Sequence, residues 1–336
     1  MEQALKDRFA AIEPLIGHTP LLEISFTYKG KARRIFAKAE YYNLTGSIKD
    51  RVALYILKKA YENGDIHPGD TIVEATSGNT GISFSAIGRY LGHPVKIYMP
   101  DWMSRERIAL MESFGATVRL VSSEEGGFLG SIKMTEDFAK QGGAFLPCQF
   151  SNEDNTNAHI ESTGAEIIEQ LDSLGLKADG VVAGVGTGGT VMGISRSLKS
   201  ANPACKAFPL EPSNSPTLST GYKVGKHRIY GISDEFIPDL LKLPEMDQIV
   251  SVDDGDAICM ARKLSETLGI GVGVSSGANF LGSVLAGDTL GDDAVIVTVF
   301  ADDNKKYLST DYAKTQTPPE GSLSADISLT GVRVIR

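Results

Sequence analysis

Apolar residues occur in two patterns along most of the chain. Short apolar runs, such as residues 71–75, 95–99 and 180–185, are separated by longer stretches in which apolar positions recur every three or four residues. The first pattern is typical of buried strands and the second of amphipathic helices. Since the two alternate through short connections, the sequence predicts βαβ units and an α/β fold with two mostly parallel sheets.

Several segments carry separate expectations. We predict one long helix over about 153–171 and another over 304–314. Residues 212–246 are irregular and contain clusters of Pro, Ser and Gly, which in a compact chain is usual for a functional or mobile stretch. After a linker-like segment at 315–325, residues 327–335 are predicted as a final strand, with a partner subunit as its expected neighbour.

Composition and charge narrow the class of protein. With 336 residues, 42% of them hydrophobic and 22% charged, the chain has the composition of an ordinary soluble globular protein. The formal net charge of -9 argues against nucleic acid or an anionic membrane as the main partner, because both need concentrated Lys and Arg. The chain has no apolar run that could span a bilayer and no signal-peptide layout, so we expect a cytoplasmic protein.

Cysteine and histidine do not form ligand patterns. Cys148, Cys205 and Cys259 are widely spaced, which fits buried thiols in a reducing compartment better than disulfides or a zinc site. The five histidines include no i, i+4 pair. We therefore expect no metal site.

A lysine stands at the predicted start of a helix. Ser47 is placed to cap this helix, and Asp50 to complete a box-like pair with it. Lys49 is unusual there, because the positive end of the helix dipole disfavours cations. The same environment would lower the pKa of the amine and make it a better nucleophile. The alternative is a solvated surface lysine, which is the common case.

Two polar, glycine-containing turns join a strand to a helix. In the first, residues 76–81, unpaired backbone N–H groups favour a carboxylate or phosphate, although a simple polar turn is an equal alternative. The second, residues 184–190, matches Gly-x-Gly-x-x-Gly, with Glu211 about 20 residues on. A dinucleotide site, a cup for a single phosphate and a structural turn all remain open for it. A nucleotide triphosphatase is disfavoured because the P-loop lysine is absent.

A third glycine-rich stretch, residues 271–278, places Ser275 at a helix start, where ordinary capping is the alternative. Three turns suited to anions and one nucleophilic lysine together indicate pyridoxal phosphate. Its aldehyde forms a Schiff base with an amine, while its phosphate and ring nitrogen need separate partners.

Four segments, in chain order, resemble the cysteine synthase and cystathionine β-synthase group of pyridoxal-phosphate enzymes. They are Thr-Gly-Ser-Ile-Lys-Asp-Arg, Thr-Ser-Gly-Asn-Thr-Gly, Gly-Val-Gly-Thr-Gly-Gly-Thr and Ser-Ser-Gly-Ala. The resemblance extends from about Ile16 to Thr310, nearly the whole chain. It makes the dinucleotide interpretation of residues 184–190 a remote one.

The resemblance implies an architecture. Two three-layer α/β domains with twisted, mostly parallel sheets would hold pyridoxal 5'-phosphate in the cleft between them, as in fold type II. Residues 43–153 would form the smaller, mobile domain, residues 1–42 and 154–314 the larger one, and residues 315–336 a linker and tail. A homodimer acting on a small amino-acid substrate is also implied.

The resemblance further implies roles for individual residues. Lys49 would hold the cofactor and remove the Cα proton of the substrate, while Asn79 would contact the cofactor's ring oxygen and Ser275 its ring nitrogen. The phosphate would lie against Gly186, Thr187, Gly188, Gly189 and Thr190. The substrate carboxylate would bind to Thr76, Ser77, Gly78, Thr80 and Gln149.

The implied chemistry is β-elimination or β-replacement on a serine- or cysteine-type amino acid through an aminoacrylate. A cysteine synthase, which adds sulfide to O-acetylserine, is one candidate. The other is an enzyme that releases hydrogen sulfide from cysteine and forms serine, lanthionine or cystathionine. A non-catalytic binding protein is disfavoured by the intact Lys49 and phosphate cup.

Two segments depart from the family pattern. Typical cysteine synthases have Gly-Ala-Gly-Phe where this chain has Ser-Asp-Glu-Phe at 233–236. An inward-facing Asp234 or Glu235 would repel a hydrosulfide anion, or act as general base for water or a thiol; the alternative is that both acids face solvent. Residues 300–304, Phe-Ala-Asp-Asp-Asn, replace a typical Pro-Ser-Ser-Gly-Glu. We expect neither departure to touch the cofactor residues.

Overall fold

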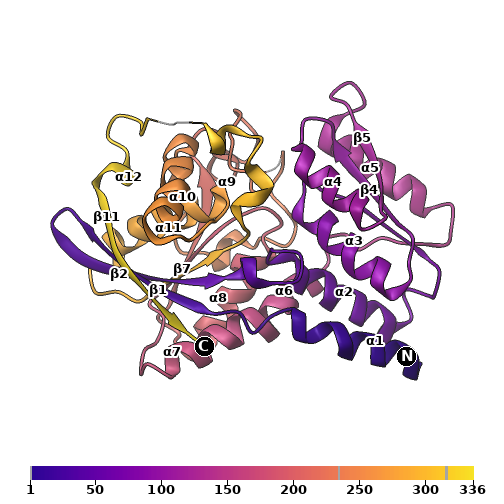
Figure 1. Cartoon of the computed structure of the whole chain (residues 1–336), viewed down its shortest axis with the longest axis horizontal. Helices are drawn as coiled ribbons and strands as arrows, with labels where there is room; N and C mark the ends of the chain where they lie inside the picture. Colours follow the sequence, from indigo (N-terminus) through magenta and orange to yellow (C-terminus); the bar gives the residue numbers. More distant parts are fainter. Residues whose placement is uncertain (1, 234, 315–316) are drawn as a thin grey trace.

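Two sheets lie side by side and divide the molecule into a smaller and a larger half (Figure 1). The computed structural model describes residues 2–233, 235–314 and 317–336. The larger sheet has seven strands in the order β11 (Ile327–Ile335), β1 (Leu21–Tyr28), β2 (Lys31–Ala39), β10 (Ile296–Phe300), β7 (Gly180–Gly184), β8 (Lys206–Pro212) and β9 (Val250–Val252). The smaller sheet has four, in the order β5 (Thr117–Val121), β4 (Val95–Pro100), β3 (Thr71–Ala75) and β6 (Ala144–Phe145).

The strand directions confirm the predicted α/β class. All pairs in the smaller sheet are parallel, as are the pairs from β2 through β10, β7 and β8 to β9. Only β1 runs against its neighbours β2 and β11. Because carboxyl ends of parallel strands share one edge, the loops that follow β3, β7 and β10 are brought toward the same region between the sheets.

The last strand forms as predicted at the edge of the larger sheet, with a backbone neighbour in the same chain, and contact with a partner subunit stays a prediction. Strand β11 pairs with β1 of the same chain, and Leu21 lies opposite Ile335. Ile327 and Ile335 are buried, whereas Val332 and Val334 are exposed. The apolar pattern of an edge strand therefore identifies a half-buried strand, but it cannot say which strand supplies the backbone partners.

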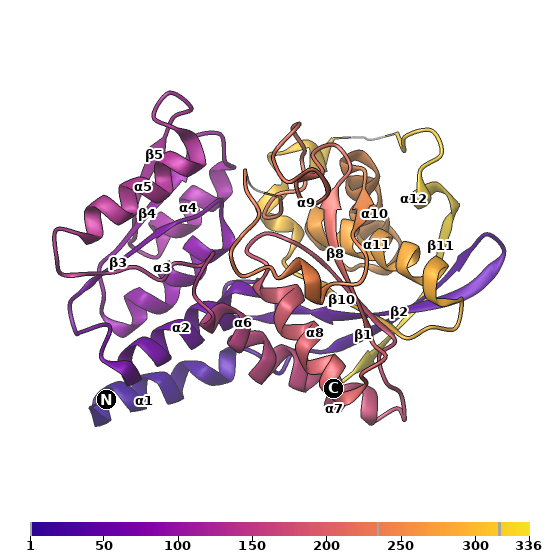
Figure 2. The ribbon, with the colours of Figure 1, turned by 180° about the vertical axis from the view of Figure 1, so that it is seen from behind.

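Helices cover both faces of each sheet (Figure 2). The larger sheet packs one apolar core against α10 (Asp254–Leu268) and α11 (Val274–Leu290), and a second against α7 (Ala165–Asp172) and α8 (Gly189–Ala201). The smaller sheet packs against α2 (Lys49–Asn63), α3 (Asn79–Leu91), α4 (Arg105–Ser113) and α5 (Gly127–Ala139). Three shorter helices are α6 (Asp154–Ala158), α9 (Thr217–Thr220) and α12 (Leu323–Asp326).

The first helix belongs to the core of the smaller half. In α1 (Gln3–Ile12), Phe9 and Ile12 are buried in the cluster formed by α2, α3 and the smaller sheet. The division implied by the family resemblance places these residues with the larger domain instead. These residues of α1 therefore share the apolar core of α2 and α3.

Two predicted helices are interrupted. The stretch expected as one helix over 153–171 consists of α6, a π-helical turn at His159–Gly164 and α7. A Cβ on Gly193 of α8 would lie 2.5 Å from His159 Cβ and from the carbonyl oxygen of Thr156, so α8 packs tightly onto this turn. Residues 304–314 form two 3-10 turns, Asn304–Tyr307 and Asp311–Ala313, because the side chains of Asp303 and Thr310 accept hydrogen bonds from backbone N–H groups within the segment.

No helix in the described ranges is both long enough and apolar enough to cross a bilayer.

Candidate active site

The motifs singled out in the sequence meet in one pocket between the two sheets. It is lined by the loops that precede α2, α3, α8 and α11, and by Gln149. The predicted residues that line it are Lys49, Thr76, Ser77, Gly78, Asn79, Thr80, Gln149, Gly186, Thr187, Gly188, Thr190 and Ser275. Gly189 is buried at the first position of α8, directly beside these residues.

Lys49 is the first residue of α2, and its half-buried side chain lines the pocket. This position contradicts the alternative of a solvated surface lysine. The predicted box-like pair is absent, since the Asp50 carboxylate accepts hydrogen bonds from Thr45 N and Oγ1 and from Ser83 Oγ, each at 2.6 Å. Burial raises the pKa of Asp50. Asp50 therefore fixes the loop before Lys49 to α3 instead of capping α2.

The turn after β3 presents a helix N-terminus to the pocket. Thr80 Oγ1 donates to Gln149 Oε1 at 2.6 Å, and Gln149 Nε2 donates to the carbonyl oxygen of Ala75 at 2.7 Å. A Cβ on Gly78 would lie 2.5 Å from Arg107 Cδ, so a side chain at this position would displace Arg107 of α4. These contacts hold the backbone N–H groups at the start of α3 beside the pocket, and the binding of a carboxylate by residues 76–81 stays a prediction.

Glu74 supports this turn, and our sequence reasoning missed it. It is fully buried in β3 and accepts hydrogen bonds from the backbone N–H groups of Ala75 at 2.9 Å and Gln149 at 3.3 Å. Burial raises the pKa of Glu74 to about 8. One acidic residue within the otherwise apolar strand 71–75 was the available signal.

The turn after β7 forms a cradle that fits a phosphate group. A Cβ on Gly186 would overlap the carbonyl oxygen of Gly231, and a Cβ on Gly189 would overlap Asn155 Oδ1. Gly188 has a positive φ of 85°. Thr187 Oγ1 accepts from Gly189 N at 3.3 Å and from Asn155 Nδ2 at 2.9 Å, which leaves its own hydrogen for a ligand. These donors and the start of α8 suit the phosphate of pyridoxal phosphate.

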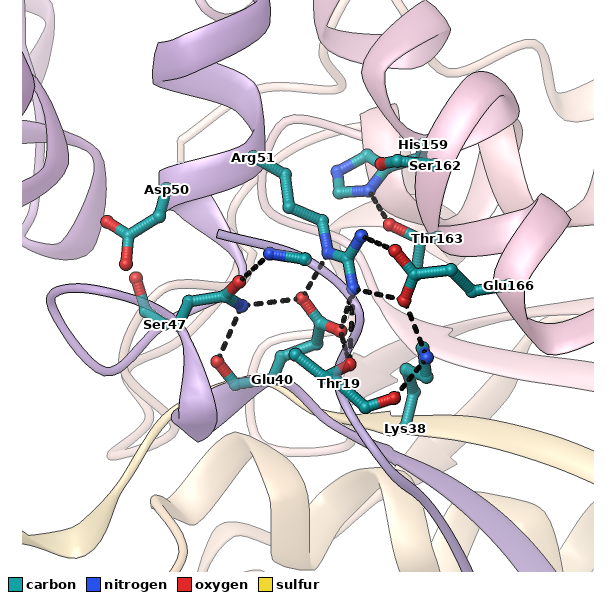
Figure 3. A network of polar contacts seen from close by, with 12 residues as sticks. Thr19, Lys38, Glu40, Ser47, Asp50, Arg51, His159, Ser162, Thr163 and Glu166 are labelled. Atoms are coloured by element: carbon teal, nitrogen blue, oxygen red, sulfur yellow. Dashed lines mark hydrogen bonds and ion pairs between the residues drawn. The ribbon is translucent and has the colours of Figure 1, made fainter. Parts of the chain in front are cut away.

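His159 contacts the phosphate cradle through the hydroxyl group of Thr190. Expected at the surface or in simple packing, it is fully buried, with Nδ1 2.9 Å from Thr163 Oγ1 and Nε2 3.3 Å from Thr190 Oγ1. Figure 3 shows the contact with Thr163. Burial, and then the positive charge of Lys49, lower the pKa of His159 well below its usual value. His159 is therefore neutral and acts as a hydrogen-bond partner of the cradle.

The segment after β10 contacts the cofactor residues, so the expectation that it would not is wrong. Asn79 Nδ2 donates to Asp302 Oδ2 at 2.8 Å, and Lys306 Nζ donates to Asn79 Oδ1 at 3.1 Å. Ile48 N donates to the carbonyl oxygen of Ala301 at 2.9 Å. Residues separated by more than 200 positions along the sequence thus form one buried cluster behind the pocket.

The comparisons with known proteins agree with this geometry. Residues 12–302 match the family described as "Pyridoxal-phosphate dependent enzyme". The chain belongs to this family. Its cofactor is pyridoxal 5'-phosphate, and both the fold and the resemblance noted in the sequence are confirmed.

Relatives of this pyridoxal-phosphate enzyme are of the cysteine synthase type. A "Probable cysteine synthase" of Bacillus subtilis (strain 168) is 39% identical over 88% of this chain and 95% of that protein. "Cysteine synthase B" of Campylobacter jejuni is 40% identical over 89% of this chain and 97% of that protein. A solved hydrogen sulfide-producing enzyme from Fusobacterium nucleatum is 61% identical over 98% of this chain and 99% of that chain, with a TM-score of 0.96.

Of the two acids noted in the sequence, the structure describes Glu235. Asp234 lies outside the described residues. Glu235 lies not in the Lys49 pocket but in an adjoining one, where it pairs with Lys223 at 3.1 Å. Both pockets are lined by Ser77, Tyr230 and Ile232, so the adjoining pocket opens onto the enzyme's active site.

Glu211 is not placed to bind a ribose. Glu211 is fully buried and accepts hydrogen bonds from Leu218 N at 2.7 Å and Ser219 N at 3.2 Å, so it anchors the following loop rather than a ribose. Within the described ranges, no cluster of His, Cys, Asp and Glu could hold a metal ion.

A buried ionic network lies behind Lys49. Figure 3 shows Arg51 between the carboxylates of Glu40 and Glu166, with Lys38 on the far side of Glu166. Burial alone would raise the pKa of Glu166, but hydrogen bonds and charge from Arg51 and Lys38 outweigh it and lower this pKa to about 2. The network fixes the first turn of α2, and hence Lys49, against β2 and α7 of the larger half.

Proposed function

We propose that this enzyme releases hydrogen sulfide from cysteine by β-elimination or β-replacement. The observation that carries the proposal is its 61% identity to the hydrogen sulfide-producing enzyme from Fusobacterium nucleatum, against 38–40% for the cysteine synthases. An aspartate-to-asparagine mutant of that relative, 60% identical to this chain, was solved with an α-aminoacrylate intermediate. Because the product named for that relative is hydrogen sulfide, we take cysteine as the donor substrate.

Different residues of the pocket would have different roles in the reaction. The amine of Lys49 would bind the cofactor's aldehyde carbon and, once released, carry the Cα proton of the substrate. Bound pyridoxal phosphate supplies an electron-withdrawing ring that stabilises negative charge at Cα. Asn79 would contact the ring oxygen and Ser275 the ring nitrogen. A neutral serine hydroxyl does not favour a charged ring nitrogen as a carboxylate would, so loss of the group at Cβ is preferred over other reactions.

Substrate orientation would come from the start of α3. Its backbone N–H groups, with Thr76, Ser77, Gly78, Thr80 and Gln149 around them, would hold the α-carboxylate. The phosphate would lie in the cradle of Gly186, Thr187, Gly188, Gly189 and Thr190. The substrate's Cα hydrogen would then face Lys49.

Asp234 and Glu235 would distinguish the reaction of this enzyme from that of a cysteine synthase. In the proposed reaction, cysteine and water give serine and hydrogen sulfide. The Cβ–S bond breaks and the sulfur leaves as hydrosulfide, a Cβ–O bond forms, and water gives up one proton, which finally joins the hydrosulfide. Asp234 would take that proton as general base, and its charge would disfavour the return of hydrosulfide. Glu235 is paired with Lys223 in the adjoining pocket, and we assign it to binding of the incoming group.

Cysteine synthase activity is the second candidate. It is favoured by curated relatives such as the "Cysteine synthase" of Staphylococcus aureus, 38% identical over 89% of this chain and 95% of that protein. In that case O-acetylserine would be the donor and sulfide the nucleophile.

Separate incubations with cysteine and with O-acetylserine plus sulfide decide between the two. We expect cysteine to give sulfide and serine in equal amounts, and Asp234→Asn to lose serine formation while it keeps bound cofactor. Asp239→Asn, which changes an exposed acid of the same segment, is the matched control. Efficient cysteine formation from O-acetylserine, with little sulfide from cysteine, would overturn the assignment in favour of the second candidate.

We further propose that residues 43–153, together with α1, move as one unit that closes on the substrate carboxylate. The separate apolar core shared by α1, α2 and α3 supports this division. A cytoplasmic homodimer is proposed from the family resemblance and the absence of paired cysteines among Cys148, Cys205 and Cys259. Small-angle scattering with and without cysteine tests the closure, and light scattering tests the dimer.

A further inference from the structure

The side chain of Asn79 is hydrogen-bonded to two buried charged residues, Asp302 and Lys306. Asp302 is fully buried, and its Oδ2 accepts from Asn79 Nδ2 at 2.8 Å and from the Tyr307 hydroxyl at 2.5 Å. Its Oδ1 is buried too and accepts no hydrogen bond from any residue in the described ranges. A buried carboxylate oxygen without a donor is costly, and such a group is seldom kept for packing alone.

A buried cation holds the other end of the same amide. Lys306 is 2% exposed, and its Nζ donates to Asn79 Oδ1 at 3.1 Å and to the carbonyl oxygen of Gly46 at 3.0 Å. The amide of Asn79 is therefore clamped between a carboxylate on its nitrogen and an ammonium on its oxygen. One N–H of Asn79 is used by Asp302, and the second remains for a ligand in the pocket that Asn79 lines.

The same segment also fixes the two other parts of the site. Ser47 forms an isolated backbone bridge with Asp302, and Ala301 N donates to Ser276 Oγ at 3.0 Å. A Cβ on Gly273 would overlap Asp302 Oδ1, so the loop before Ser275 lies directly on this carboxylate. Other charged groups packed around the cluster are Asp50, Asp303 and Arg107, the last of which lies 4.6 Å from the Tyr307 ring centroid.

We propose that Asp302 and Lys306 are positioning residues that orient Asn79 and set the electronic state of the bound cofactor through it. The inference rests on the proposed function, in which Asn79 contacts the cofactor's ring oxygen. The carboxylate and the ammonium act on that oxygen in opposite directions. The negative charge of Asp302 favours a protonated ring oxygen, and the positive charge of Lys306 favours an ionised one.

Opposite shifts in the cofactor's absorbance test this inference. Holoenzyme variants Asp302→Asn and Lys306→Gln keep a hydrogen-bonding group of similar size but remove the charge. The visible band of the cofactor is titrated over pH, with cofactor content measured in parallel. We expect the midpoint to fall by about one pH unit in Asp302→Asn and to rise by about as much in Lys306→Gln, from a unit charge acting across one side chain.

Matched controls come from the same turn. Asp303→Asn and Lys305→Gln remove neighbouring charges that do not contact Asn79, and we expect shifts less than half as large. A role in packing alone would not move the midpoint in opposite directions. If either charge variant that retains cofactor titrates like the wild type, the inference fails and the proposed function stands. If borohydride fixes no cofactor on Lys49 of the wild type, both fail.

Discussion

The guanidinium of Arg51 donates to both carboxylate oxygens of Glu166, with Nη1 to Oε1 at 2.6 Å and Nη2 to Oε2 at 2.8 Å. Arg51 stands two residues after Lys49 in α2, and Glu166 is in α7 on the other side of the junction (Figure 3). This bidentate pair therefore connects the helix that carries the lysine to the larger sheet. It makes the position of Lys49 dependent on a residue more than 100 positions away.

Loss of this carboxylate should destabilise the protein. In Glu166→Ala, Arg51 and Lys38 would both lose a buried partner, and we expect the free energy of unfolding to fall by about 3 kcal/mol. Glu169→Ala is the matched control, because Glu169 is an exposed residue of the same helix. Urea unfolding followed by circular dichroism measures both. Equal stability of the two variants would show that the pair contributes little.

The same pair predicts an acid dependence. The folded pKa of Glu166 is lowered from 4.5 to about 2, so its contribution to stability is complete above the ordinary value and is lost as pH falls through the folded one. The stability difference between the wild type and Glu166→Gln should therefore shrink as pH falls from 4.5 toward 2. Unfolding free energies of both proteins at a series of pH values provide the test, and a constant difference would contradict it.

Lys49 should be required for both cofactor attachment and turnover. We expect Lys49→Ala to lose the visible band of the lysine-bound cofactor and to lower turnover by about 10³-fold or more, since it removes the covalent link and the proton carrier together. Lys58→Ala changes a partly exposed lysine of the same helix, whose amine pairs with Glu13 away from the pocket, and should retain both. Absorbance spectra and sulfide release are measured side by side. A Lys49→Ala enzyme with wild-type turnover would contradict the assignment.

The phosphate cradle should not tolerate a side chain. In Gly189→Ala the new Cβ would overlap Asn155 Oδ1, so Asn155 must shift and would no longer hold Thr187. We expect the affinity for pyridoxal phosphate to fall at least about tenfold, which corresponds to about 1.4 kcal/mol. Gly331→Ala in β11 is the control, because no atom lies within 4 Å of its added Cβ. Cofactor titration of the apoenzyme measures both, and unchanged affinity in Gly189→Ala would argue against the cradle.

The site residues that can be predicted from the sequence share one local feature, which is a position at the start of a helix. Lys49, Asn79, the turn at 184–190 and Ser275 all stand where a strand or loop enters a helix, and such junctions are marked by glycine and hydroxyl residues. The contacts of Asp302 with Asn79 and of Arg51 with Glu166 have no such mark. They join residues 223 and 115 positions apart, and only the packed fold brings them together. The π-helical turn at His159 is likewise fixed by the close approach of α8, not by its own composition.

Strand β11 is synthesised about 300 residues after its neighbour β1. Strand β1 emerges early, but one of its two edges can be covered only when residues 327–335 have been made, since Leu21 pairs with Ile335. Until then a row of unpaired backbone groups beside Leu22, Ile24 and Phe26 would face other nascent chains. The larger sheet is therefore complete only after residues 327–335 have been made, whereas the apolar core that α1, α2 and α3 share with the smaller sheet is drawn from residues 5–145.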